Sequence, residues 1–127
     1  QVKEINRPFT PAFWQNLLQP LPTYNTIWLG NGETMSVLNS SIAAVFRRQQ
    51  LVEIQLLPVY KNQNAELVQH ALKTFDIPNT KAAFLKLFPD AYDSIGKLTY
   101  YGEKMEISAL YSQNTGNLIE SVVIRFM

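Results

Sequence analysis

The chain has 127 residues, of which 46% are hydrophobic and 17% charged, with no cysteine and a formal net charge of +1. A chain of this length can build one hydrophobic core without disulfides or metals, so we expect a single soluble domain over residues 1–127. The absence of cysteine excludes disulfide scaffolds, thiol nucleophiles and cysteine-ligated metal sites. The near-zero net charge, with Arg47-Arg48 as the only adjacent basic pair, argues against a nucleic-acid-binding protein.

The first thirty residues predict one helix and one strand. Residues 1–8 are expected to be an extended lead-in, and Thr10-Pro11 is a good helix start because a hydroxyl can cap and a proline fits the first helical position. Pro20 should end this helix. Residues 24–29 are rich in β-branched and aromatic side chains, which predicts a strand that ends at the sequence Gly30-Asn31-Gly32.

The segment that follows has apolar residues at helical spacing. Met35, Leu38, Ile42 and Val45 recur at intervals of three and four, which predicts one amphipathic helix over residues 34–48. The alternative is a hairpin that turns at residues 39–41. A second strand is expected over residues 51–59. If these two strands share a sheet, the segment from 24 to 59 should form a right-handed parallel crossover.

Two further helices are expected next. Asn64 can cap a helix that carries Glu66 in its first turn and Lys73 near its last, both favourable for the helix dipole. Another helix should start near Thr80, and Pro89 could open one more helical turn that stops at Gly96.

The last third of the chain reads as three strands, over residues 98–101, 105–111 and 118–127, with turn residues between them. They predict a C-terminal antiparallel meander with one face on the helices. The element order is therefore α-β-α-β-α-α-β-β-β. We expect an α+β fold in two layers, with a mixed five-stranded sheet packed against helices.

Signals for catalysis and for metals are weak. The only histidine, His70, lies opposite the apolar stripe of its helix and should face solvent. Asp90 and Asp93 are close enough to share a cation, but helix-start acids are the simpler interpretation. We therefore predict no catalytic residue, no metal site and no cofactor.

A small-ligand site is the alternative functional reading. Gly30, Asn31 and Gly32 follow a strand and precede a predicted helix, where free N–H groups could attract an anion. The third glycine of a dinucleotide-binding motif is missing. This hypothesis places a pocket at the strand-helix junction of residues 30–34, with Thr34 and His70 as the further ligand-binding residues.

Tyrosines in the last third favour a partner-binding surface. Tyr100 and Tyr101 must face opposite sides of a regular strand, so one of them lies outside the core, where tyrosine commonly anchors a partner. We assign Tyr100, Tyr101 and Tyr111 to this surface, together with Asn114 and Asn117 of the last turn.

The leading functional hypothesis is a non-catalytic protein-protein interaction or assembly domain that binds a protein partner or a second copy. The charged fraction lies below the ~25% of typical soluble domains, which supports a partly covered surface. No apolar run is long enough to span a membrane. The sequence leaves the compartment open, and we favour the extracytoplasmic part of a bacterial envelope protein over a cytoplasmic protein. It does not identify the partner, the ligand or the oligomeric state.

Overall fold

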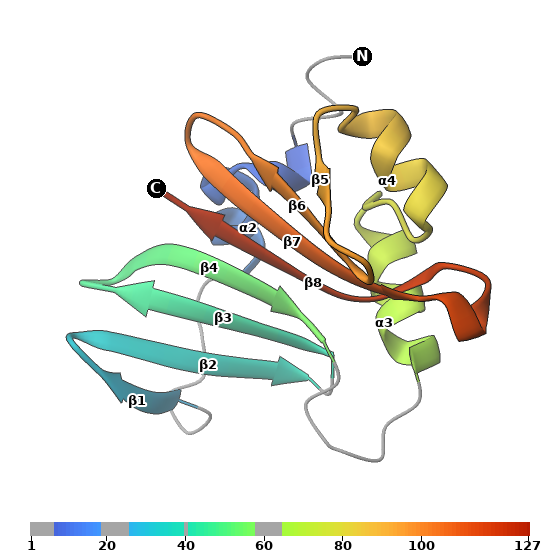
Figure 1. The fold of residues 1–127 in the computed structure, drawn as a ribbon. Helices are drawn as coiled ribbons and strands as arrows, with labels where there is room; N and C mark the ends of the chain where they lie inside the picture. Colours follow the sequence, from blue (N-terminus) through green and yellow to red (C-terminus); the bar gives the residue numbers. More distant parts are fainter. Residues whose placement is uncertain (1–6, 19–25, 40, 58–64) are drawn as a thin grey trace.

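The computed structural model describes residues 7–18, 26–39, 41–57 and 65–127. Within these residues, eight strands form one sheet, and three α-helices and two short 3-10 helices accompany it (Figure 1). The helical elements are η1 (Arg7–Phe9), α2 (Pro11–Leu18), α3 (Ala65–Thr74), α4 (Lys81–Leu87) and η3 (Gln113–Thr115). The strands are β1 (Thr26–Gly30), β2 (Glu33–Asn39), β3 (Ile42–Arg47), β4 (Gln50–Leu56), β5 (Tyr92–Asp93), β6 (Lys97–Tyr101), β7 (Met105–Ser112) and β8 (Leu118–Phe126).

Every pair of neighbouring strands in this sheet is antiparallel. The spatial order is β1-β2-β3-β4-β8-β7-β6-β5, so the chain makes one four-stranded meander, crosses through α3 and α4, and returns by a second meander. The last strand, β8, closes the sheet by pairing with β4. Strands from the two halves of the chain therefore meet at the centre of the sheet, and β1 and β5 form its two edges.

The predicted fold class is wrong. The protein is mostly β, with one antiparallel sheet of eight strands and a few short helices, rather than an α+β domain with a mixed five-stranded sheet. The expected parallel crossover between residues 24 and 59 is absent from the described residues, because β1 to β4 are joined directly as neighbouring antiparallel strands.

The main cause of this error is the segment predicted as a helix over residues 34–48, which forms β2 and β3; the hairpin alternative is correct. Four consecutive residues of β3, 42 to 45, are buried, so both faces of this strand are covered. Periodicity alone cannot distinguish such a run from a buried helix. The β-branched side chains of Thr34, Val37 and Val45 are the contrary signal, since they favour strands.

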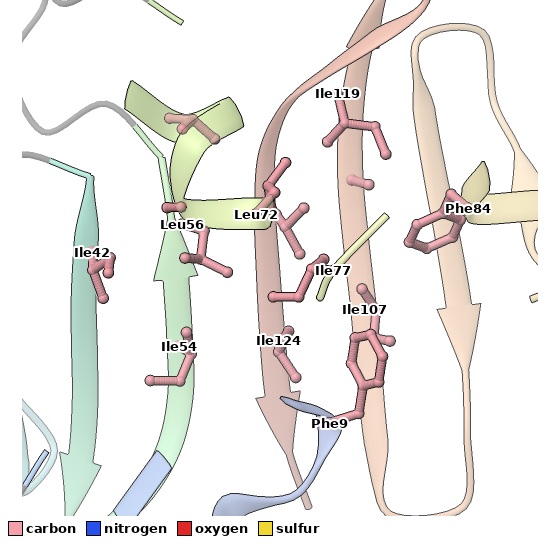
Figure 2. Packing of buried hydrophobic residues seen from close by; sticks show 14 of the residues in the cluster. Phe9, Ile42, Ile54, Leu56, Leu72, Ile77, Phe84, Ile107, Ile119 and Ile124 are labelled. Carbon is pink, nitrogen blue, oxygen red and sulfur yellow. The ribbon is translucent and has the colours of Figure 1, made fainter. Parts of the chain in front are cut away.

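A single core lies between the helices and one face of the sheet, which we call the helix face (Figure 2). Helices α2 and α3 both contact β4, and α3 also contacts β8. Phe84 of α4, Leu72 of α3 and Trp14 of α2 are fully buried in this core. The Trp14 indole N–H donates a hydrogen bond to the Pro8 carbonyl over 2.6 Å. The three helices predicted for these regions are thus present, and each buries at least one large apolar side chain in this core.

The central strand β8 buries its apolar side chains in the core. Ile119 and Val122 are three residues apart, yet both are fully buried. A register shift opposite Leu110 and Tyr111 makes this possible, because a β-bulge adds one residue to one strand and restores the inward direction. Ile124 continues the same face, between Ile54 of β4 and Ile107 of β7.

Other local expectations have mixed outcomes. Helix α4 starts after Thr80, as predicted, and the Thr80 side chain caps it by accepting a hydrogen bond from the Ala83 N–H. The helical turn expected at Pro89 is absent, since residues 89–90 form a turn before β5. Residue 7 of the expected lead-in begins η1, while residues 1–6 lie outside the described residues. The expected cap at Asn64 also lies outside them.

Candidate functional site

The predicted ligand pocket at residues 30–34 has a different geometry from the one expected. Gly30, Asn31 and Gly32 form the exposed turn between β1 and β2, and all three have positive φ angles (85°, 54° and 76°). Asn-Gly is the preferred pair for a tight hairpin turn with two positive φ angles. Thr34 is part of β2 and pairs with Trp28. No helix starts here, so the proposed strand-helix anion site does not exist.

His70 lies on α3 and is exposed, as its position opposite the apolar stripe predicts. It lines a hollow of about 390 Å³ with Ser41, Ile42, Thr74, Phe75 and two further residues, none of which belongs to the Gly30–Thr34 turn or carries a carboxylate. The predicted ligand-binding residues therefore lie on two separate parts of the surface.

The three predicted partner-binding tyrosines have three different environments. Tyr101 is 70% exposed on the face of the sheet opposite the helix face, which we call the open face. Tyr100 points to the helix face, where its ring centroid lies 4.5 Å from that of Phe88. Tyr111 is buried in the core cluster. Of the three, Tyr101 is exposed, Tyr100 is half-buried against Phe88 and Tyr111 is buried.

The two predicted asparagines also differ. Asn114 is exposed in η3, and its backbone N–H donates to the Ser112 hydroxyl. Asn117 is half-buried with a φ of 66°, and its backbone carbonyl accepts from the Lys81 N–H. Its buried side-chain oxygen has no hydrogen-bond partner among the described residues. Asn117 thus shapes the turn before β8.

Tyr111 takes part in the best-defined polar cluster of the described residues. Its hydroxyl donates a hydrogen bond of 2.7 Å to one Asp93 carboxylate oxygen, and the Lys81 ammonium lies 3.1 Å from the other. The same ammonium lies 4.9 Å from the centroid of the Tyr111 ring. The cluster ties the start of α4 to β5 and β7.

The electrostatics of this cluster are those of a structural contact. The hydrogen bond from Tyr111, followed by that from Lys81, lowers the pKa of Asp93 below its ordinary value of 3.8. The hydrogen bond to Asp93 is the main cause that raises the pKa of Lys81 above its ordinary value of 10.5. Both groups therefore stay charged near neutral pH. General acid-base catalysis needs pKa values near the working pH, and these shifts run the opposite way.

Four large apolar side chains are exposed at the β5 end of the sheet. Ile95 is 93% exposed, Tyr101 is 70% exposed, Tyr92 is 68% exposed and Leu110 is 47% exposed. We call these four residues the aromatic corner. Single exposed apolar residues are ordinary on protein surfaces, whereas a group of them marks interaction sites.

Strand register places three residues of the aromatic corner on one face. Tyr92 pairs with Thr99, and Tyr101 is two residues further along β6, so both tyrosines point to the open face. Lys97 lies two residues before Thr99 and pairs with Leu110, which puts Leu110 on this face as well. Ile95 is in the turn between β5 and β6. Tyr92, Tyr101 and Leu110 thus share the open face at this end of the sheet, with Lys97 beside Leu110, and Ile95 lies in the adjoining turn.

A hollow of about 410 Å³ lies on the open face near the other end of the sheet, with Val45 among its lining residues. Two ion pairs line it. Arg47 lies 2.9 Å from Glu33, and Arg125 lies 3.1 Å from Glu53. The second Glu53 oxygen accepts a hydrogen bond of 2.6 Å from the Gln55 side chain. The two arginines and two glutamates of this hollow balance one another in charge.

Sequence reasoning identified Tyr101 and missed Tyr92, Ile95 and Leu110. The alternation of residues 105–111 already places Leu110 on the face away from the core. Tyr92 and Ile95 were assigned to a helical turn after Pro89, which concealed that they flank an edge strand. Only the pairing of β5 with β6 brings them beside Tyr101.

The described residues contain neither a metal-binding cluster nor a membrane-spanning helix. No group of three or more histidine, aspartate or glutamate side chains is placed to hold a metal ion. None of the helices there has the length and apolar character needed to cross a membrane.

Comparison with protein families, curated proteins and solved structures found no match to this chain.

Proposed function

We propose that this protein is an interaction domain that binds another protein through the aromatic corner. The observation that carries the proposal is the exposure of Tyr92, Tyr101 and Leu110 on the open face, with the exposed Ile95 in the turn beside them. Tyrosine is enriched at interfaces because it adds a large contact area at a small cost in side-chain entropy, and its hydroxyl still bonds to water or to a partner.

The support under these side chains favours the same function. Tyr100, the neighbour of Tyr101, packs its ring against Phe88, and Tyr111, the neighbour of Leu110, is fixed by Asp93. The backbone of the corner is therefore held from the helix face. A surface that is already ordered loses little conformational entropy when a partner binds.

The partner should present an apolar surface with few charges. Lys97 is the charged side chain that lies on the open face beside Leu110, and Glu106 lies beside Tyr101 on β7. One positive and one negative group give no strong field for a highly charged partner. Most of the binding energy should come from burial of the two tyrosines and Ile95.

Photo-crosslinking in cells of the native source tests this function. A benzophenone amino acid at position 101 should give a crosslinked product of discrete mass, whereas the same group at Lys86, which is exposed on α4, should not. The double variant Tyr92→Ser/Ile95→Ser, with the probe kept at 101, should lose most of the product. Equal products from positions 101 and 86, or a product unchanged by the double variant, would contradict the proposal.

A small-ligand function is the second candidate, moved from the turn to the hollow of the open face. Its support is the volume of about 410 Å³ with both charge signs in its wall. Such a wall suits a small molecule that carries a positive and a negative group. Arg125→Met should then abolish binding in a thermal-shift screen of zwitterionic metabolites, while Lys86→Met should not. A screen without any hit that depends on Arg125 would reject it.

A further inference from the structure

Strand β1 is an open edge of the sheet. It pairs with β2 on one side, and no described strand lies on its other side (Figure 1). An edge strand presents a row of unpaired backbone N–H and C=O groups, which another strand can satisfy. The other edge, β5, has only two residues and offers a far shorter row.

The residues of β1 lack the usual protection of an edge. Proteins protect edge strands with lysine, proline or inward-pointing charges, and the segment Thr26–Gly30 contains none of these. Its one protective feature is the register shift between Trp28 and Gly30. An unprotected apolar edge is a template for pairing with another strand.

Two large apolar side chains of β1 are exposed to solvent. Trp28 is 81% exposed and Leu29 is 46% exposed. Leu29 lines the hollow of the open face, whereas Trp28 pairs with Thr34 and belongs to the opposite, helix face. A strand added at this edge would therefore cover apolar side chains on both faces of the sheet.

We propose that β1 pairs with β1 of a second copy of this chain, in antiparallel orientation, to form a dimer with a continuous sheet. Such a two-fold contact places a strand against itself, so any charge on it would approach the same charge on the other copy. The segment Thr26–Gly30 carries no charge. The whole chain has a net charge of only +1, so two copies repel each other weakly. Both features favour a second copy over a charged peptide as the occupant.

The area at this edge predicts a reversible dimer. A tryptophan can bury up to about 250 Å², so the 81% exposure of Trp28 leaves about 200 Å² per copy in water. The two tryptophans together contribute about 400 Å², and stable interfaces bury about 1,200 Å² or more. We therefore expect monomer and dimer to exchange, with the dimer favoured at high protein concentration.

Sedimentation velocity from about 10 µM to about 1 mM tests the dimer. The wild type should show an average mass that rises towards twice that of the monomer. Trp28→Lys should stay monomeric over the same range, because it places two positive charges at the contact. Leu67→Lys, on α3 and outside both proposed binding surfaces, is the matched control and should dimerise like the wild type. Circular dichroism verifies that the variants fold, since both side chains are exposed.

Opposite charges test the pairing itself. Trp28→Glu alone should be monomeric, and an equal mixture with Trp28→Lys should recover the dimer. A wild type that stays monomeric at every concentration overturns the proposal, and so does a mixture that does not associate. Loss of the dimer in Leu67→Lys but not in Trp28→Lys would also overturn it. Crosslinking at position 101 does not depend on β1, so the two proposals can fail separately.

Discussion

The adjacent residues Tyr100 and Tyr101 provide the sharpest test of the open face. Tyr100 is half-buried, and its ring packs against Phe88 with a centroid distance of 4.5 Å. Replacing a fully buried aromatic residue with alanine costs about 3–5 kcal/mol. Because Tyr100 is only half-buried, we expect Tyr100→Ala to cost about 2–3 kcal/mol, which includes the loss of the aromatic pair. Tyr101→Ala should change the free energy of unfolding by less than about 0.5 kcal/mol, since Tyr101 is 70% exposed.

Urea denaturation measures both values, and the fluorescence of Trp14, which is fully buried, reports unfolding. In a thermal scan the loss for Tyr100→Ala corresponds to roughly 10 °C in Tm, and Tyr101→Ala should melt within about 2 °C of the wild type. A large loss of stability in Tyr101→Ala would refute the reasoning, because Tyr101 would then be packed rather than available to a partner. A Tyr100→Ala variant as stable as the wild type would refute the orientation of β6.

Three further predictions concern the core and the polar cluster. The interactions that lower the pKa of Asp93 stabilise the fold at pH values above its ordinary pKa of 3.8, and this stabilisation is lost as the pH falls through the pKa of the folded state. The difference in Tm between the wild type and Asp93→Asn should therefore narrow in acid. Ile124→Ala should lower the free energy of unfolding, measured by urea denaturation, by about 2–5 kcal/mol, because β4 and β7 flank the cavity that the shorter side chain leaves. A loss below about 1 kcal/mol would contradict the central position of Ile124. Trp14→Phe keeps most of the ring but removes the hydrogen bond to the Pro8 carbonyl, so calorimetry should show a loss of about 1–3 kcal/mol.

The helices and the final meander could be predicted because each depends on local signals. The strands expected over residues 98–101, 105–111 and 118–127 agree with β6, β7 and β8 to within one or two residues. The start of α4 near Thr80 depends on one side chain and the N–H groups of the helical turn that follows it. Neighbours in sequence provide these interactions, so the sequence is sufficient to find them.

The hairpin between β3 and β4 shows why the middle of the chain was misread. Its turn consists of Arg48 and Gln49, with φ angles of 51° and 67°. Positive φ angles favour glycine and asparagine, and neither residue type is present. The pairing of β3 with β4 offsets the free-energy cost of this backbone conformation. A turn that the tertiary structure imposes leaves no local signal in the sequence.

The candidate site divides in the same way. Alternation along a strand shows that Tyr100 and Tyr101 face opposite sides, but it does not show which side the core covers. The pairing of β5 with β6, and the core on the other face, decide that Tyr101 and Tyr92 share the open face, with Ile95 in the turn beside them. The same pairing, together with Lys81, fixes Asp93 to Tyr111 and removes Tyr111 from the surface.

The sequence by itself excluded chemistry that needs cysteine, showed the low charged fraction, and predicted helices α2, α3 and α4 and the C-terminal meander. The tertiary structure decided that the sheet has eight antiparallel strands, that β8 inserts beside β4, and that β1 and β5 are its edges. The physical reason is that strand pairing joins residues far apart in the chain, as between residues 54 and 124. Local propensity carries no information about such partners, and burial of the shared face selects them.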